Sequence, residues 1–379
     1  MQFIALSLLV LFTLDVNAMD IDAKDAQAEM GKTTMTLRRV HSGGSDYIFH
    51  MSWDSGANQW KLVSFEPDQG YGWRPEAKMP TGTYWAGSAV WGKNLYVVGG
   101  SGHYDKISIY NSLTNQWTQR TVDWMGFLLR AAAYLSKIYI FDTSDAGDPG
   151  WIYDLNTKTM SSMPGTPPNL EWTSEPAVYN GKIYFFGGYG PLNSVWEFNP
   201  ETFTFKKKAN LPTAGYASST AVLNEKIYVI GGNYRRDKIE VYDPKTNTWG
   251  SSLSFAGLSL SGWDTAAPIG GKIVITDAET GNTFLFNPVT KTLTTQESMP
   301  EIRYDYLTGE SLGGRLYVAG GEGARNRLDS FKPGLTKSSA ITWSPHSEMQ
   351  VSTTAKADYE AKEAQHLRRM EEVRRESKN

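Results

Sequence analysis

The sequence predicts an all-β fold, a β-propeller with seven four-stranded blades in preference to six. Across the 379 residues one sequence motif recurs every 42–46 positions. It consists of a short apolar strand, two glycines, an aromatic residue about eleven positions later, and often a Trp seven positions after that. No helical period separates the copies, and each copy has room for four short antiparallel strands. A four-stranded unit that repeats at this period is typical of propeller blades.

The clearest copy runs through Lys226–Ile230 into Gly231-Gly232, then reaches Tyr242 and Trp249. Runs of β-branched and aromatic residues bounded by glycine suit strands that are covered on both faces. Small residues precede each anchor, as in Ala131–Ala133, and we expect them to form an innermost strand near a narrow axis. The six anchors are Gly99-Gly100, Phe141-Asp142, Gly187-Gly188, Gly231-Gly232, Thr276-Asp277 and Gly320-Gly321.

This pattern resembles the kelch repeats, whose hallmark is a double glycine followed by Tyr and then Trp. The resemblance covers about residues 33–354 and implies a propeller that carries recognition loops on one face. It is imperfect, because two anchors have lost both glycines and three Trp positions hold Met160, Phe205 and Leu293.

A seventh blade is predicted near the N-terminus, where Gly43-Gly44, Trp53-Asp54 and Trp60 repeat the anchor, the aromatic and the Trp. Met35–Val40 would form its second strand. Residues 349–354 have the composition of its missing innermost strand. Pairing between strands from the two chain ends would then close the ring and remove its open edges.

The chain ends are expected to lie outside the propeller. Phe3–Leu14 is an apolar run, too short for a membrane span, and Val16-Asn17-Ala18 follows it as a small-residue cleavage pattern. Residues 1–18 are therefore predicted to be a signal peptide of a secreted, extracellular protein with no membrane span. Residues 19–32 form an acidic lead. Residues 355–379 form a charged tail, with a weak amphipathic pattern that suits either a helix or a solvated segment.

Composition argues against several classes of function. A net charge of −3 gives no reason to expect nucleic acid as a partner. No cysteine is present, which excludes thiol catalysis and Cys-ligated metals, and the five histidines are scattered, so no cofactor is expected. The spacing of Asp142, Asp145 and Asp148 suggests a weak calcium site, with an acidic surface turn as the alternative.

The motif Gly309-Glu310-Ser311-Leu312-Gly313 matches a hydrolase elbow, but that motif needs a strand-to-helix turn. Here it lies between predicted strands, so no catalytic residue is assigned.

An aromatic residue recurs where the chain enters each innermost strand, and loop residues add further aromatic and cationic side chains nearby. A ring of aromatics at the channel mouth would suit stacking on sugars or anchoring of a peptide. In the alternative, these side chains wedge between blades and face inward. The candidate ligand-binding residues are Trp85, Phe127, Trp172, Tyr216, Trp263, Tyr306, Tyr234, Arg235 and Arg325.

We therefore expect a secreted, non-catalytic propeller that binds a protein or glycan partner. The alternative is an exported carbohydrate-active enzyme, similar to kelch sugar mutarotases or sialidase-like propellers. It requires arginines and acids to converge at the channel. The candidates for such a set are Arg130, Glu171, Glu175, Arg303 and Asp305.

Overall fold

The computed structural model describes the chain as two units, residues 1–71 and 72–379. Within them, the described residues are 21–22, 27–30, 34–42, 45–54, 59–67, 70–123, 125–144, 150–190, 192–303, 306–334 and 340–341.

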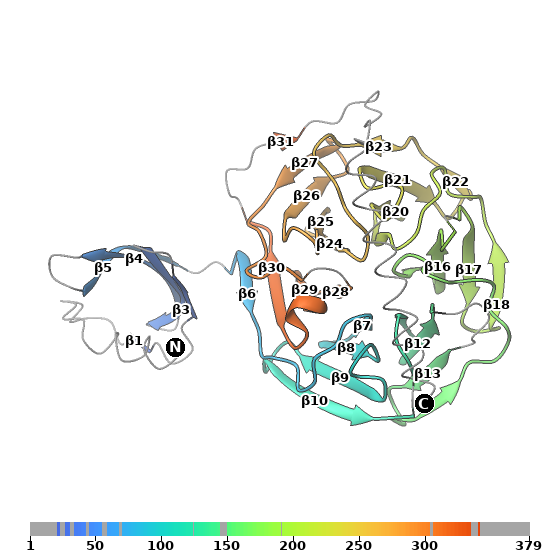
Figure 1. Ribbon diagram of the computed structural model, residues 1–379, viewed down its shortest axis with the longest axis horizontal. Coiled ribbons are helices and arrows are strands. Elements are labelled where there is room, and N and C mark those ends of the chain that lie inside the picture. Colours follow the sequence, from blue (N-terminus) through green and yellow to red (C-terminus); the bar gives the residue numbers. More distant parts are fainter. Residues whose placement is uncertain are drawn as a thin grey trace. The chain divides into compact units, whose positions relative to one another are not determined.

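The second unit is a propeller of six blades, each a sheet whose strands follow one another outwards from the centre (Figure 1). The first two blades are β7 (Gly87–Trp91), β8 (Asn94–Val98), β9 (Lys106–Asn111) and β10 (Gln116–Thr121), then β11 (Leu129–Tyr134), β12 (Lys137–Asp142), β13 (Trp151–Asp154) and β14 (Met160–Ser162). The third and fourth are β15 (Ala177–Tyr179), β16 (Lys182–Phe186), β17 (Val195–Asn199) and β18 (Thr204–Lys207), then β19 (Ser219–Leu223), β20 (Lys226–Ile230), β21 (Lys238–Asp243) and β22 (Thr248–Trp249), with β23 (Leu253–Ser254) also on β21.

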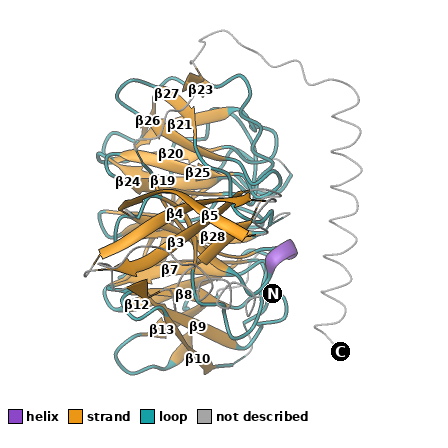
Figure 2. Ribbon diagram, turned by 90° about the vertical axis from the view of Figure 1, so that its left-hand side faces the viewer, coloured by secondary structure: helices purple, strands orange, loops and turns teal. Residues whose placement is uncertain are grey.

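The fifth blade is β24 (Thr265–Ile269), β25 (Lys272–Thr276), β26 (Thr283–Asn287) and β27 (Thr292–Thr295), with β31 (Ala340–Ile341) added to β27. The sixth is β28 (Leu307–Leu312), β29 (Arg315–Gly320) and β30 (Leu328–Lys332), and its outermost strand is β6 (Gly72–Pro75). A 3-10 helix, η1 (Glu322–Ala324), lies among the loops on one side of the strands (Figure 2).

The prediction of seven blades is wrong. The innermost strands contact one another in the order β7, β11, β15, β19, β24 and β28, and β28 contacts β7. The hydroxyl of Thr308 on β28 lies 2.5 Å from that of Ser88 on β7. Six blades therefore surround the axis. The segment 349–354, which was predicted to supply a closing strand, lies outside the described residues.

The candidate seventh blade belongs to a separate sheet in the first unit. That sheet has the order β1 (Ile21–Asp22), β3 (Thr34–Ser42), β4 (Ser45–Asp54) and β5 (Gln59–Pro67), and β2 (Gln27–Met30) also pairs with β3. Trp53 does pair with Trp60, as the blade pattern predicts. However, β1 and β2 occupy the edge of β3 where a blade would carry an innermost strand of small residues.

The recurring sequence signals form the junctions of the blades. In the fourth blade, the Trp249 indole N–H donates to the carbonyl of Ala209 at 3.0 Å, and Asn247 accepts bonds from Tyr242 and from the Ala209 N–H. The same arrangement recurs in the first blade around Trp117. The Tyr and Trp of the motif therefore stabilise the contact between the outer strands of a blade and the segment that leads into that blade.

Candidate functional site

The six innermost strands line a central channel whose surface changes along the axis in three layers. The layers follow the order of residues along each strand: aromatic residues just before it begins, polar residues near its start, and small apolar residues further along. We call these the aromatic layer, the channel floor and the sleeve.

The aromatic layer contains all six aromatic residues that the sequence spacing singled out. They are only 1–7% exposed, and they pack together with Tyr84 in one cluster: Trp85, Phe127, Trp172, Tyr216, Trp263 and Tyr306. Trp172 of the third blade contacts Trp263 of the fifth, with ring centroids 6.0 Å apart. Since those blades are not neighbours, the layer reaches across the axis.

Backbone hydrogen bonds join this layer from blade to blade. Trp263 N–H donates to Ala217 O at 3.0 Å, and Ala217 N–H donates to Trp172 O at 2.9 Å. These residues adopt left-handed backbone, with φ between 53° and 61°. Such conformations cost free energy in non-glycine residues, and the surrounding contacts hold them in place.

The loop residues predicted with this layer behave differently from one another. Tyr234 is 55% exposed. Arg235 is buried and forms an ion pair with Glu240 at 2.5 Å, while Arg325 stacks on Tyr84 at 4.5 Å. Apart from Tyr234, the predicted aromatics offer little surface to a ligand. Ligand binding at this rim therefore stays a prediction, and it would require the layer to open.

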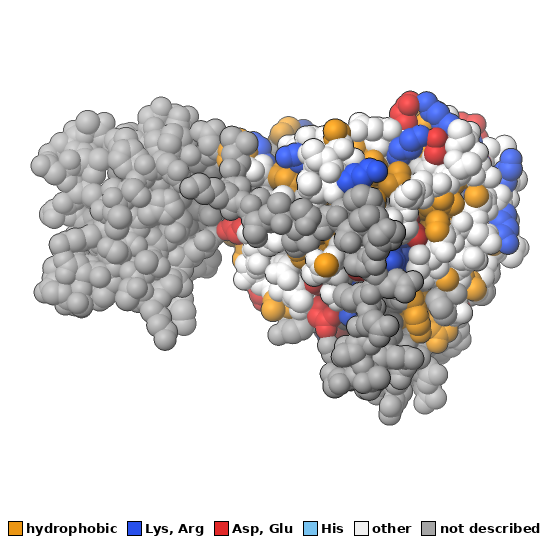
Figure 3. All heavy atoms as spheres, turned by 90° about the horizontal axis from the view of Figure 1, so that it is seen from above, with side chains coloured by type: hydrophobic (Ala, Val, Ile, Leu, Met, Phe, Trp, Pro, Cys, Tyr) orange, Lys and Arg blue, Asp and Glu red, His pale blue; other side chains and the backbone are white. Residues whose placement is uncertain are grey.

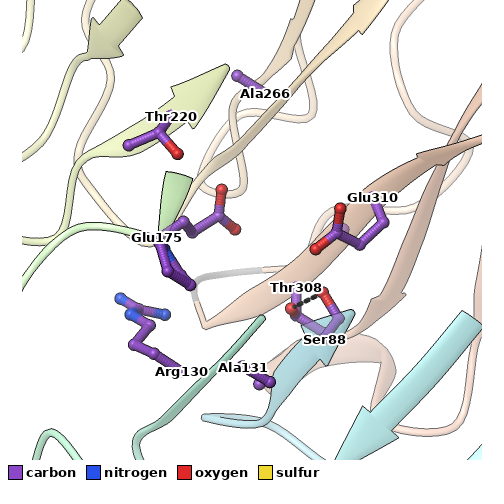
Figure 4. Close-up of a pocket in the computed structure, with 11 residues that line it drawn as sticks. Ser88, Arg130, Ala131, Glu175, Thr220, Ala266, Thr308 and Glu310 are labelled. Carbon is purple, nitrogen blue, oxygen red and sulfur yellow. Dashed lines mark hydrogen bonds between the residues drawn. The ribbon is translucent and has the colours of Figure 1, made fainter. Parts of the chain in front are cut away.

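The channel floor is a cavity of about 40 Å³ beside the aromatic layer. All six blades contribute to it, and its polar side chains are Ser88, Arg130, Glu175, Thr220, Thr308 and Glu310. Figure 4 shows the carboxylates of Glu175 and Glu310 directed toward the space between them, with Arg130 on the Glu175 side. A cavity of this size holds a few water molecules or the tip of a polar ligand.

Arg130 connects the floor to the aromatic layer. Its guanidinium lies 5.1 Å from the ring centroid of Trp263 and donates to the carbonyl of Thr173 at 3.3 Å. Its Nε has no hydrogen-bond partner among the described residues. Burial lowers the pKa of Arg130 to about 10, and the nearby charge of Glu175 opposes that shift.

The two carboxyl groups have unusually few partners. The Glu175 carboxyl accepts a 3.4 Å hydrogen bond from the Thr265 hydroxyl and another from the backbone N–H of Thr220. The Glu310 carboxyl has no hydrogen bond or ion pair with any described residue. Burial raises the pKa of Glu175 to about 8, against the attraction of Arg130. Burial, followed by repulsion from Glu175, raises the pKa of Glu310 well above its usual range. Both side chains border the narrow channel and are half-buried.

The sleeve leads from the floor toward the two-residue turns that join the first and second strands. Its cavity measures about 250 Å³. Small apolar side chains from five blades line it, notably Ala89, Ala132, Ala177, Ala221 and Ala267. The small-residue runs predicted for the innermost strands therefore leave a lined passage along the axis.

Other candidates are placed outside this channel. Arg303 is buried in an ion pair with Asp329, and Asp305 lies outside the described residues. Glu171 is half-buried, and burial raises its pKa.

The calcium candidate is described only at Asp142, which accepts bonds from the backbone and hydroxyl of Ser144. Asp145 and Asp148 lie outside the described residues. Among the residues that the structure does describe, no group of three or more His, Cys, Asp or Glu side chains is placed to hold a metal ion.

Sequence reasoning considered Arg130 and Glu175 but missed Glu310 as their neighbour. The elbow motif drew attention to Ser311, yet residues 309–312 lie in β28, an innermost strand, and turn directly into β29. The sequence did contain a signal for Glu310, because this acidic residue occupies a strand position that holds small or apolar residues in other blades.

Comparisons with known proteins agree with this architecture. The family model of the KLHDC2/KLHL20/DRC7 Kelch-repeats domain matches residues 88–275. Kelch-like protein 23 of Mus musculus is 28% identical over 156 residues, which make up 38% of this chain and 27% of that protein. Kelch domain-containing protein 3 of Homo sapiens is 35% identical over 63 residues, 15% of this chain and 16% of that protein. The chain thus covers well under two thirds of either relative.

The solved structure of YjhT superposes with a TM-score of 0.57 at 13% identity, covering 70% of this chain and 99% of that one. At this identity the likeness shows the fold alone. Within the described part of the chain, no helix has the length and apolar character needed to cross a membrane.

Proposed function

Since this chain belongs to the kelch-repeat proteins, we propose that it is a non-catalytic interaction module that binds a partner protein through its propeller. The observation that carries the proposal is the central channel, to which every blade contributes. The floor brings polar side chains from several blades together at the end of a passage lined by small side chains. Concave sites with convergent polar groups are common ligand sites of proteins. On the side seen in Figure 3, charged side chains of both signs are scattered among other residues, which argues against binding through a single broad charge field.

Blocking the sleeve tests this proposal. Ser311 lines the sleeve, so Ser311→Trp should fill it, while Leu113→Trp adds the same bulk on an exposed outer hairpin where Leu113 is 75% exposed. In quantitative affinity capture, we expect the wild type and Leu113→Trp to capture a partner that Ser311→Trp does not. Equal capture by all three proteins would contradict it, provided that circular dichroism shows each variant folded.

We also propose that the protein acts outside the cell. The support is the apolar run Phe3–Leu14 followed by Val16-Asn17-Ala18. Terminal sequencing of protein recovered from culture medium should begin at Met19. Recovery only from cells, with residues 1–18 retained, would overturn this part.

A second candidate is a carbohydrate-active enzyme, and the convergence of Arg130 with Glu175 and Glu310 favours it. Two carboxyl groups with raised pKa values resemble the acid–base pairs of sugar chemistry. Anomeric exchange of a panel of aldoses, followed by NMR, should accelerate with the wild type and not with Glu175→Gln. No acceleration with any sugar would leave the binding module as the function.

A further inference from the structure

The channel floor contains a carboxyl group that has no counter-charge. Three charged residues line the two cavities, namely Arg130, Glu175 and Glu310. In Figure 4 the guanidinium of Arg130 lies on the Glu175 side of the cavity, and Glu310 lies on the opposite side. The charge of Arg130 accordingly acts on Glu175, whereas Glu310 is repelled by Glu175. With both carboxylates ionised the floor therefore carries one uncompensated negative charge.

A buried carboxylate can be neutralised in two ways, by a proton or by a cation. No described side chain supplies the cation to Glu310. The lysines that begin the second strands, such as Lys137, Lys182 and Lys226, do not line either cavity, and Lys226 already pairs with Asp243 at 2.5 Å. Burial and repulsion from Glu175 raise the pKa of Glu310, and a ligand cation in the cavity would favour the charged form of this carboxyl instead.

The route to the floor restricts the shape of that ligand. The aromatic layer covers one end with closely packed rings, so entry is from the sleeve. Alanine and valine side chains line the sleeve, which suits a slender unbranched aliphatic stem with a polar tip.

We infer that the channel floor binds the ammonium group of an unbranched aliphatic amine, held between Glu175 and Glu310 with its stem in the sleeve. The inference rests on the proposed function for its most direct source, a lysine side chain of the partner protein. A free alkyl amine has the same chemistry, and the two sources are separated below.

The first experiment measures calorimetric binding of n-pentylammonium to the full chain, with 1-pentanol and pentanoate as neutral and anionic counterparts. Pentylammonium should bind about tenfold or more tightly than either, because a charge-assisted bond to a carboxylate is worth more than a neutral one. Glu310→Gln should remove that preference. Glu225→Gln, which deletes a negative charge from an exposed turn residue paired with Lys245, should leave it unchanged.

Proton release gives an independent readout. If the ammonium replaces a proton, the observed enthalpy will depend on the ionisation enthalpy of the buffer, with protons released, and affinity will rise between pH 5 and pH 8. Preference for pentanoate, with proton uptake and affinity that falls as pH rises, would overturn the inference and assign the floor to anions. Equal binding of all three probes, or none, would also overturn it.

The source of the amine is then separated with peptides. Acetyl-Gly-Gly-Lys-Gly-Gly-amide should bind, and its norleucine counterpart should not. Binding of 1,5-diaminopentane without the lysine peptide would assign the site to free amines. Failure of every amine while a partner is still captured through the sleeve would sink this inference and leave the proposed function standing.

Discussion

Glu310 on β28 and Glu175 just before β15 show how individual residues can set the character of the channel. Transferring a carboxylate away from water is costly unless a charge or hydrogen bonds compensate. The Glu175 carboxyl has Arg130 nearby and accepts hydrogen bonds from the Thr265 hydroxyl and the Thr220 backbone, and the Glu310 carboxyl has no such partner among the described residues. A carboxyl group placed at such a cost is a candidate functional group, and the proposed ammonium site gives it a role.

These groups predict a particular dependence of stability on pH. The folded pKa of Glu175 is raised from 4.5 to about 8, and that of Glu310 is raised as well, so the folded chain holds protons that the unfolded chain has released. Their contribution to the free energy of unfolding must therefore fall as pH rises from about 4.5 through 8. The double variant Glu175→Gln/Glu310→Gln should gain about 1–3 kcal/mol over the wild type between pH 5 and pH 8, measured by urea unfolding.

Glu225→Gln controls for the change in net charge and should show no such gain. His103 contributes with the opposite sign between about pH 4 and pH 6.5, because burial lowers its pKa from 6.5 to about 4, but it is common to all the variants and cancels in the comparison. A constant difference across pH would contradict the assignment of raised pKa values to the two carboxyls.

At the scale of elements, the double glycine is a point of close approach between the end of the second strand and the chain entering the first. Gly231 and Gly232 have φ of 57° and 94°. A Cβ atom at Gly232 would lie 2.5 Å from the Ser218 hydroxyl and 2.6 Å from the Tyr216 carbonyl. In the second and fifth blades, Asp142 and Asp277 accept backbone N–H bonds instead, so side-chain capping replaces the glycines.

Gly232→Ala should therefore destabilise the chain by about 2 kcal/mol or more, from backbone strain and the clash together. Gly250→Ala is the matched control, since its Cβ would meet only ordinary contacts at 3.6 Å and beyond. Denaturant midpoints of the two variants should differ clearly. Equal midpoints would show that the anchor tolerates a side chain.

The Trp position gives a second test at this scale. Trp249→Phe keeps the packing against Tyr242 but removes the 3.0 Å bond to the Ala209 carbonyl. We expect a loss of about 1 kcal/mol in the free energy of unfolding. Trp91→Phe, at a more exposed position, should change it little; a similar loss in both variants would refute the role of the indole N–H.

At the scale of the whole molecule, the sixth blade joins distant parts of the second unit. β6 pairs with β30, and Trp73 on β6 is fully buried. Its indole donates to the Thr283 hydroxyl at 3.1 Å and to the Glu297 carbonyl at 3.0 Å. These contacts link residues more than 200 positions apart, so the propeller depends on long-range pairing.

Trp73→Ala should cost about 3–5 kcal/mol, the range for removing a large buried aromatic. Urea unfolding followed by circular dichroism measures it, and Trp91→Ala provides the comparison. If Trp73→Ala is no worse than Trp91→Ala, then β6 is not an integral strand of the sixth blade.

Local patterns determined the architecture of each blade. The glycine pairs, the aromatic and the Trp at constant offsets are set by backbone conformation and short-range hydrogen bonds, which adjacent residues control. The all-β, four-stranded blades and the six main repeats could be read from them. The spacing also predicted the six aromatic positions around the channel, from Trp85 in the first blade to Tyr306 in the sixth, and these residues do pack in one layer.

Tertiary structure alone decided the number of blades, the burial of the aromatic layer and the proximity of Glu310 to Glu175 in the channel floor. Gly43-Gly44 and Trp60 match the blade motif locally. A blade of the propeller also needs an innermost strand, and for this segment that strand would have to come from a distant part of the chain. Likewise, Glu310 and Glu175 are 135 positions apart. Their electrostatic coupling arises only when the third and sixth blades meet around the axis, and no local pattern encodes such a distance.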